Sequence, residues 1–434
     1  MRNIVRQKII DFQEAPFPGI TRRDVHLPVV PGKAIAVIGM RRTGKTCFLW
    51  QVIADRARQG AGRERTLLFN FEDDRLAGMT ADDLHWVADE FFRLYPEGRD
   101  RDRTLFCLDE VQAVPGWETF VRRLLDTENI ELFLSGSSAR LLSREVATSM
   151  RGRSMEALVH PFSFREYLRH HGKEPEAGTE RLSKAVLSSL NHKLPAYLAS
   201  GGFPEAQGLT GRDRFELLRG YVDVALFRDV VERHAVSQPT ALRWLTRQLL
   251  GNAAGLFSIN KYANDMRSQG ISVGKDTLHA FLAHLEDAFL VRTIGIASTS
   301  ERQRRVNPRK VYPIDPGLIP VFDRSGRANI GHALETAVLL SLDRRGAELA
   351  YAKSPEGYEV DFLARFPDGR QELIQVCADP DDPGTVDREL RALSAGAREL
   401  PAAGLRLVTL FPEAVKETPA GVKVHSAVDW LLSE

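Results

Sequence analysis

The sequence has few cysteines and no long apolar run. Its three cysteines lie far apart and form no CxxC pair, so neither a disulfide framework nor a zinc site is indicated. No stretch approaches the roughly 18 apolar residues of a membrane span, and charges interrupt the amino-terminal segment where a signal peptide would need an apolar core. We therefore expect a cytoplasmic protein. We also expect small buried side chains at Cys47, Cys107 and Cys377.

The chain also lacks an excess of charge of either sign. Lys plus Arg (59) nearly cancel Asp plus Glu (58), so no global field would hold the whole protein on nucleic acid or on an anionic membrane. Any basic site must be local. The composition is that of a globular protein, with 43% hydrophobic residues, and a length of 434 residues predicts about three domains.

Short apolar runs alternate with helical patterns in the first third of the chain. The runs AIAVIG, TLLFNF, TLFCLD and ELFLSG are each followed by a helical pattern, which is the order of repeated βα units. For residues 1–160 we predict an α/β fold with a parallel sheet and helices on both its faces. One apolar stripe has the spacing of a buried helix face, and it comprises Trp117, Phe120, Val121, Leu124 and Leu125.

The most specific motif follows the first of these runs. The segment AVIGMRRTGKT has the spacing GxxxxGK[ST] between an apolar strand and a helix. Glycines let backbone N–H groups curl around phosphates, and the helix offers its positive N-terminal end. Lys45 can then reach the β- and γ-phosphates of ATP, and the Thr46 hydroxyl can bind Mg²⁺. The predicted nucleotide-binding residues are Gly39, Met40, Arg41, Arg42, Thr43, Gly44, Lys45, Thr46 and Cys47.

Two carboxylates follow the third apolar run. The segment TLFCLDEVQ places Asp109 and Glu110 at the end of a predicted strand. Either acid alone is typical of a capped turn. Together with the P-loop, their order predicts that Asp109 holds Mg²⁺ with Thr46 and that Glu110 polarises the attacking water as a general base.

Two further parts of such a site are less specific. The end of the next strand, where a polar residue can sense the γ-phosphate or position water, offers Ser135, Ser137 and Ser138. Ser137 or Ser138 could equally be the N-cap of the following helix. Arg151 and Arg153 are candidates for stabilising transition-state charge, in cis or from a neighbouring subunit. As isolated arginines they would be solvated surface residues, and the sequence leaves an oligomer open. No guanine-reading NKxD motif follows the fourth strand, so ATP is the expected nucleotide.

Seven segments together resemble a known family. They are GMRRTGKT, FNFEDDRL, LDEVQAVPGWE, SGSSARLL, RGRSMEALVHPFSFREYL, GGFPEA and KVYPIDPGL, and in this order they are similar to prokaryotic AAA-type P-loop ATPases that carry a C-terminal domain of unknown function. The resemblance covers nearly the whole chain. It implies an ATP-binding core with an additional strand between the two nucleotide-binding strands, a winged-helix middle and a nuclease-like C-terminal fold.

The middle section, residues 161–327, consists mainly of long helical patterns. The segments SINKYANDMRSQG and SVGKDTLHAFLAHLEDAFLVRTI predict two helices joined by a turn and followed by a strand, as in a winged helix-turn-helix. DNA is the favoured partner, because a basic stretch after this strand can neutralise phosphates. The same stretch equally fits a solvated hairpin. The predicted DNA contacts, besides the winged helix, are Arg302, Arg304, Arg305, Arg309 and Lys310.

The final section, residues 328–434, predicts a smaller α/β domain. Glu335 on a helix, Asp361 in GYEVDF and the strand ELIQVCA are similar to the layout of restriction-type nucleases. Those enzymes have an E-x-K strand, whereas here Cys377 stands where the lysine is expected. Because a cation that polarises the attacking water is missing, we predict a nuclease-like fold without cleavage. Lys353 on the preceding strand is a candidate replacement.

These patterns predict a Mg²⁺-dependent ATPase whose nucleotide state is coupled to a partner, with DNA favoured. One alternative is an ATP-gated nuclease, for which Asp361→Ala would abolish metal-dependent cleavage. The other is an ATP-sensing adaptor that binds nucleotide with negligible turnover, for which Glu110→Gln would change almost nothing.

Overall fold

Two compact units make up the chain. The first contains Met1–His160 together with Asp287–Phe289, and the second contains Pro161–Glu286 and Leu290–Glu434. No described helix is both long enough and apolar enough to cross a membrane. The structure is a computed structural model, and it describes residues 1–96, 99, 103–136, 152–176, 182–323, 329–378 and 383–433.

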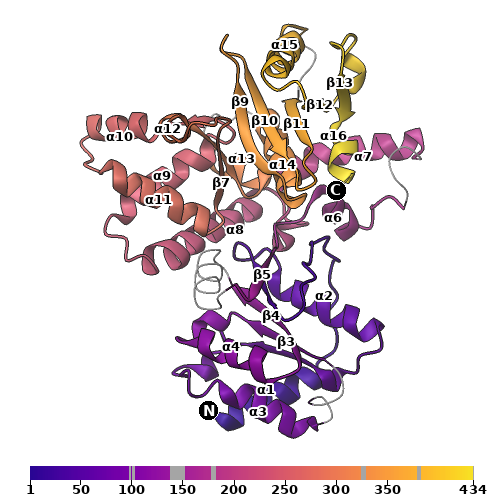
Figure 1. The fold of residues 1–434 in the computed structure, drawn as a ribbon, viewed down its shortest axis with the longest axis vertical. Coiled ribbons are helices and arrows are strands. Elements are labelled where there is room, and N and C mark those ends of the chain that lie inside the picture. The colour runs from indigo at the N-terminus through magenta and orange to yellow at the C-terminus, as the bar shows by residue number, and fades with distance from the viewer. Residues whose placement is uncertain are drawn as a thin grey trace. The chain divides into compact units, whose positions relative to one another are not determined.

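A parallel sheet of five described strands is the frame of the first unit. The strands are β1 (Ala34–Ile38), β2 (Thr66–Asn70), β3 (Thr104–Asp109), β4 (Ile130–Gly136) and β5 (Ser154–Leu158). They pair in the order β2-β3-β4-β1-β5, with every pair parallel. Figure 1 labels β3, β4 and β5 of this sheet. β4 therefore separates β1 from β3, as the family resemblance implies. This arrangement is that of a P-loop NTPase and confirms the predicted α/β class.

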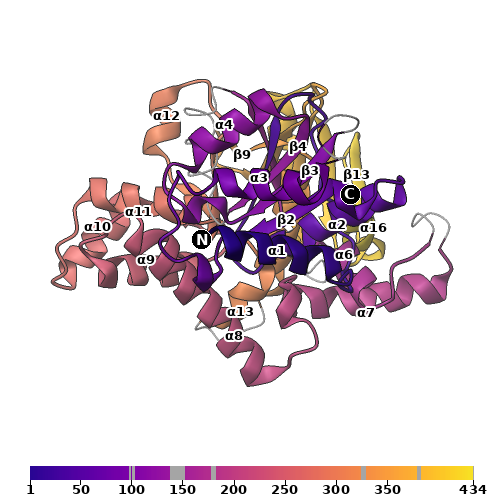
Figure 2. The same cartoon turned by 90° about the horizontal axis from the view of Figure 1, so that it is seen from below.

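Helices complete the core of the first unit. They are α1 (Arg2–Glu14), α2 (Lys45–Arg58), α3 (His85–Leu94) and α4 (Trp117–Thr127). α2 packs on β2, β3 and β4, whereas α1 packs on α3 and β2 (Figure 2). The predicted stripe of α4 is confirmed, because four of its residues are buried and Leu125 is partly buried. Neither α1 nor β5 was predicted from the sequence.

The second unit contains a mixed sheet of eight described strands. They are β6 (Leu256–Phe257), β7 (Val291–Ile296), β8 (Arg309–Pro313), β9 (Glu348–Lys353), β10 (Glu359–Arg365), β11 (Gln371–Cys377), β12 (Gly404–Thr409) and β13 (Val422–Ser426). Their order is β13-β12-β11-β10-β9-β7-β8-β6. The pairing of β7 with β9 joins strands from both sides of the predicted boundary at 327/328. The middle and final sections thus share one sheet, and their division into separate domains stays a prediction.

Helices pack on this sheet and also precede it in the chain. α14 packs on β9 and β11, and α15 packs on β10, β11 and β12. The predicted helix pair before β7 is confirmed as α10 and α11. The helices are α6 (Phe164–His170), α7 (Lys184–Ser200), α8 (Gly211–Val224), α9 (Pro239–Gly251), α10 (Ile259–Ser268), α11 (Lys275–Asp287), α12 (Glu301–Val306), α13 (Ile319–Phe322), α14 (Ile330–Arg344), α15 (Pro383–Glu399) and α16 (Ala427–Leu432), and a wider helical turn spans Ala225–Glu232.

Two of the family-like segments, GGFPEA and KVYPIDPGL, meet inside the second unit. The carboxylate of Asp315 accepts hydrogen bonds from the N–H groups of Gly202 at 2.6 Å and Gly317 at 2.9 Å. Gly201 has a φ of 75°, and a Cβ there would lie 1.7 Å from Asp315 Oδ1. Only glycine, which has no Cβ, allows the backbone at position 201 to lie this close to the Asp315 carboxylate. Burial raises the pKa of Asp315 to about 7, although both backbone hydrogen bonds oppose the shift.

The cysteines correct one prediction. Cys107 and Cys377 are buried as predicted, but Cys47 is exposed. Cys47 lies in the first turn of α2, whose core-facing side is formed by its neighbours Phe48 and Leu49. A cysteine on the opposite side of the helix is therefore left at the surface.

Candidate functional site

The P-loop connects β1 to α2 at the C-terminal edge of the first sheet. Gly44 has a φ of 96° and forms the N-cap of α2. At Gly39 a Cβ would lie 2.4 Å from the carbonyl oxygen of Val159. Both positions therefore require glycine. The N–H groups of the first turn of α2 lack partners within the helix, which makes this end suited to anions.

Lys45 lies in the first turn of α2 and is only 5% exposed. Its Nζ donates to the carbonyl oxygens of Gly39 at 3.2 Å and Met40 at 3.1 Å. It also lies 3.9 Å from Glu110 Oε1. The ammonium is thus directed into the loop, where phosphate oxygens form stronger, charge-assisted bonds than carbonyl groups do.

The other predicted loop residues have mixed surroundings. Arg41 pairs with Glu72 at 3.2 Å, and the buried Thr43 donates its hydroxyl to the Met40 carbonyl oxygen at 3.0 Å. Arg42 is exposed and has a φ of 68°. A non-glycine residue in this region is strained, and such strain is common at ligand-binding loops.

Asp109 ends β3, and its carboxylate accepts hydrogen bonds from side chains of three other elements. Its Oδ2 accepts the Thr46 hydroxyl at 2.8 Å and the Asn70 amide at 3.2 Å, and its Oδ1 accepts the Ser135 hydroxyl. The predicted metal ligands Thr46 and Asp109 are therefore neighbours. Their oxygens are the type of ligand that Mg²⁺ prefers, so the residues present fit this ion.

Glu110 follows Asp109 in a left-handed conformation, with φ 53° and ψ 41°. Its N–H donates to Ser135 Oγ at 3.1 Å, and its carboxylate accepts the Gln112 amide. Burial raises the pKa of Glu110, and the nearby Lys45 opposes the shift. A carboxyl group with a raised pKa is suited to accept a proton near neutral pH.

Arg153 does not reach this site. Its carbonyl oxygen accepts the N–H of Ala34 at the start of β1, whereas the P-loop follows the end of β1, about 16 Å along the strand. Its side chain pairs with Asp126. The structure thus contradicts a role for Arg153 in its own chain's nucleotide site, and a role in a neighbouring subunit stays a prediction. The predicted residues Arg151, Ser137 and Ser138 lie outside the described residues.

A second cluster of charged side chains lies in the second unit. Lys310 of β8 is 4% exposed, and its Nζ lies 2.8 Å from Asp361 Oδ1, 3.0 Å from Glu359 Oε1 and 3.2 Å from Glu335 Oε1. We call these four residues the carboxylate centre. Its three acids line a cavity of about 770 Å³.

Asp361 is held in the carboxylate centre by β11. Its N–H donates to Gln375 Oε1 at 3.1 Å, and its Oδ2 accepts the N–H of Val376 at 3.0 Å. The register between β9 and β10 shifts between Val360 and Leu363. Such irregularities redirect side chains and are frequent beside functional sites.

The acids of the carboxylate centre interact strongly with Lys310. Burial and the neighbouring Asp361 raise the pKa of Glu335 to about 8. Burial lowers the pKa of Lys310, but the three carboxylates raise it by more. Lys310 therefore stays protonated, because loss of its proton would leave the buried acids without their cation.

Lys310 corrects two predictions. It is not a surface contact for DNA, because its side chain is buried among carboxylates. It also supplies a cation next to Asp361, where sequence analysis found none, whereas the predicted replacement Lys353 is exposed. No local spacing connects Lys310 with Asp361, so the sequence offers no signal for this pair.

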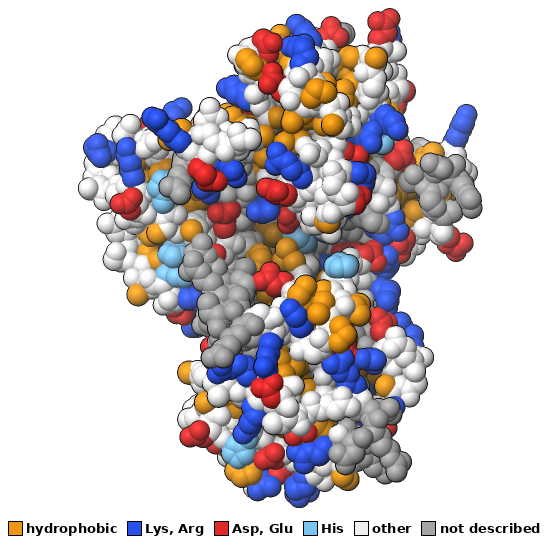
Figure 3. All heavy atoms as spheres, in the orientation of Figure 1, with side chains coloured by type: hydrophobic (Ala, Val, Ile, Leu, Met, Phe, Trp, Pro, Cys, Tyr) orange, Lys and Arg blue, Asp and Glu red, His pale blue; other side chains and the backbone are white. Residues whose placement is uncertain are grey.

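The rest of the predicted DNA patch stays at the surface. Arg302 is exposed, Arg304 pairs with Glu301 at 3.1 Å, and Arg309 lies 3.9 Å from Glu286. The side chain of Arg305 lies outside the described part of the structure. Basic and acidic side chains are interspersed over the face in Figure 3, in agreement with the balanced charge of the chain.

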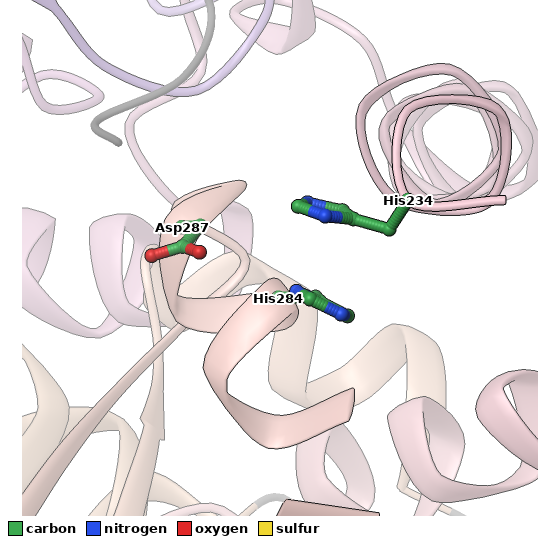
Figure 4. Close-up of side chains that lie close together, drawn as sticks. All are labelled: His234, His284 and Asp287. Atoms are coloured by element: carbon green, nitrogen blue, oxygen red, sulfur yellow. The ribbon is translucent and has the colours of Figure 1, made fainter. Parts of the chain in front are cut away.

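Two histidines of the second unit lie face to face. The rings of His234 and His284 stack with centroids 3.6 Å apart and an angle of 15° between their planes. Figure 4 shows them with Asp287, one turn beyond His284 in α11. A metal binds the ring nitrogen along the ring plane, and stacked rings direct these lone pairs side by side. We therefore assign no metal to this pair.

Comparison with known proteins agrees with the geometry of the P-loop. A model of an AAA domain matches residues 31–168, and a model of a domain of unknown function matches residues 191–326. An uncharacterized protein of Methanocaldococcus jannaschii is 31% identical over 414 residues, which cover 94% of this chain and 88% of that protein. The chain belongs to this family of AAA-type P-loop ATPases.

A second relative and a solved structure are also similar to this chain. An uncharacterized protein of Haemophilus influenzae is 28% identical over 402 residues, which cover 91% of this chain and 93% of that protein. The Walker-type ATPase PABY2304 of Pyrococcus abyssi aligns with 15% identity and a TM-score of 0.43 over 74% of this chain and 95% of that chain. For this AAA-type ATPase family member, the family and the P-loop together support nucleotide binding.

Two further residues contact the nucleotide site and were not predicted from the sequence. Asn70 ends β2 and contacts Asp109, and its place at the end of a strand beside β3 was the available signal. Arg23 contacts the P-loop carbonyl of Thr43 at 2.8 Å. It lies 20 residues before Thr43 in a segment without helix or strand, so no spacing rule points to it.

Proposed function

We propose that this protein hydrolyses ATP to ADP and phosphate with Mg²⁺ and couples its nucleotide state to DNA. The observation that carries the proposal is the convergence of Thr46, Ser135 and Asn70 on Asp109, next to Glu110. A P-loop alone binds phosphate. The carboxylate pair at the end of β3 adds the groups needed for hydrolysis.

Each residue of the site has its own role in hydrolysis. Lys45 and the N–H groups of the P-loop bind the phosphates, and Thr46 and Asp109 would hold Mg²⁺, which neutralises phosphate charge when bound. Glu110 takes a proton from the attacking water. Ser135 acts as a positioning residue, because it donates to Asp109 and accepts from the Glu110 N–H.

The order of elements expected for a winged helix-turn-helix supports DNA as the partner. The order is α9, β6, α10, α11 and the antiparallel strands β7 and β8, with β6 paired to β8. Such modules present their second helix to the major groove. Arg302, Arg304 and Arg309 lie in or beside the connection between β7 and β8, where they would contact phosphates.

Phosphate release from ATP tests this function. We would compare wild type, Glu110→Gln and the control Glu118→Gln, which lies in the first turn of α4, with and without duplex and single-stranded DNA. We expect DNA to stimulate turnover and Glu110→Gln to lower kcat by about 10²–10³-fold with little change in KM. Nucleotide binding without turnover in wild type would contradict hydrolysis and favour an ATP-sensing adaptor.

A second candidate function is an ATP-gated nuclease, favoured by the position of Lys310. Asp361 and Glu335 have the oxygen ligands that would hold a divalent ion, which activates water when bound. Lys310 contacts both acids and can position the water or stabilise the charge that develops on the phosphate.

Metal-dependent cleavage of DNA tests the second candidate. Supercoiled plasmid and single-stranded oligonucleotides would be incubated with Mg²⁺ or Mn²⁺ and with ATP. We expect Asp361→Ala to abolish cleavage and the exposed control Lys353→Met to retain it. Cleavage that persists in Asp361→Ala, or its absence in wild type, would reject this candidate.

A further inference from the structure

Arg23 lies buried between two parts of the first unit, with 5% of its surface exposed. Its guanidinium donates to the carbonyl oxygen of Thr43 in the P-loop at 2.8 Å and to the carbonyl oxygen of His160. One side chain thus connects the nucleotide loop to residue 160.

The backbone of Arg23 is fixed as well. Its N–H donates to Gln51 Oε1 at 2.6 Å, and the Gln51 amide donates back to the Arg23 carbonyl oxygen at 3.0 Å. Gln51 belongs to α2, the helix that begins at the P-loop. Because its main chain is held on α2, the guanidinium has little freedom to leave its two carbonyl partners.

The segment that Arg23 contacts is the exit of the first unit. His160 is its last residue before Pro161 begins the second unit. The preceding residue, Val159, donates its N–H to Ile38 at 2.8 Å, directly before the P-loop. The exit segment Val159–His160 is therefore attached to both ends of the loop, to one end by its backbone and to the other by Arg23.

We infer that Arg23 is a positioning residue that couples the conformation of the P-loop to the exit segment Val159–His160. Phosphate binding draws on the N–H groups of the loop and shifts its peptide groups, including the Thr43 carbonyl. Arg23 carries this shift to His160 and to the peptide that leads into the second unit. The inference rests on the proposed function, because it requires ATP to bind at the P-loop.

Hydrogen exchange measured on the full chain tests this coupling. Peptides that span residues 155–164 would be followed with and without a non-hydrolysable ATP analogue, in wild type, Arg23→Met and Arg23→Lys. The control is Arg22→Met, because the neighbouring Arg22 is half exposed and pairs with Asp55 at 2.8 Å. The affinity of each variant for the same non-hydrolysable analogue, carrying a fluorescent label, would be measured in parallel.

We expect the analogue to change exchange at residues 155–164 by about fivefold or more in wild type and in Arg22→Met. In Arg23→Met the change should disappear, while affinity for the analogue falls by at most about tenfold, the value of one lost hydrogen bond. Arg23→Lys, which keeps the buried charge and reaches one carbonyl group, should show a reduced response.

Two outcomes would overturn the inference alone. One is an unchanged response in the two Arg23 variants, and the other is a wild type that binds the analogue without any change at residues 155–164. A wild type that does not bind the analogue would instead overturn the proposed function, and the inference with it.

Discussion

Lys45 and Lys310 are both buried, but the two units hold them by different forces. The Lys45 ammonium bonds to two carbonyl oxygens of its own loop and lies 3.9 Å from one carboxylate. The Lys310 ammonium contacts three carboxylates within 3.2 Å. Neutral carbonyl groups give up an ammonium to phosphate more readily than carboxylates do.

From this difference we expect Lys45 to exchange its partners when a nucleotide binds, and Lys310 to balance the charge of the acids around it. Lys45 is placed to meet an incoming ligand, whereas Lys310 offsets the mutual repulsion of buried acids. A buried charge that loses its partner is strongly destabilising. The two lysines should therefore fail differently when removed, Lys45 in activity and Lys310 in stability.

The largest effect on stability is expected for Lys310→Met. Removing the cation leaves three acids facing one another, and we expect the free energy of unfolding of the second unit to fall by about 3–5 kcal/mol. Urea unfolding, with hydrogen exchange at β10 and β11 as the local probe, measures this loss. The exposed control Lys353→Met should change it by less than about 0.5 kcal/mol. A loss below about 1 kcal/mol in Lys310→Met would contradict charge balance as the role of Lys310.

Asp315 is a third buried ionisable group, and neutral backbone N–H groups hold it in place of an opposite charge. Its pKa is raised to about 7, so the folded unit keeps a proton that the unfolded chain releases near pH 4. Asp315 therefore contributes stability at low pH that is lost as the pH rises from about 4 to 7, by up to about 1.4 kcal/mol per pH unit. Asp315→Asn should remove this slope, as measured by urea unfolding across that range. Parallel pH profiles for wild type and variant would refute the shift.

Ser135→Ala should have the smallest effect of these changes. The variant loses one hydrogen bond to Asp109 and one from the Glu110 N–H, which should lower kcat by about tenfold with KM nearly constant. Steady-state kinetics measure the two constants separately. If kcat fell by more than a hundredfold, Ser135 would act on the nucleotide directly instead of positioning Asp109.

The parts of the molecule that sequence analysis predicted are encoded locally. The P-loop spans a few consecutive residues, and Asp109 and Glu110 are recognisable because they follow an apolar strand. The four predicted strands, β1 to β4, consist mostly of buried residues. β5 was missed because its burial is partial and charged or polar residues, such as Ser154 and Glu156, interrupt the apolar pattern.

The missed residues depend on contacts between distant segments. Lys310 reaches Asp361, 51 residues away, and Arg23 reaches His160, 137 residues away. Neither residue belongs to a pattern with a fixed spacing. The expected cis role of Arg153 failed for the same reason, because only the sheet topology shows that it lies at the edge opposite the P-loop.

The most direct test of the account is ATP turnover by Lys45→Ala compared with Lys33→Ala, a lysine just before the opposite end of β1. We predict that wild type and Lys33→Ala release phosphate at similar rates and that Lys45→Ala is slower by about 10³-fold, with no loss of stability beyond about 1 kcal/mol. Equal turnover in Lys45→Ala and wild type would contradict a nucleotide site at the P-loop.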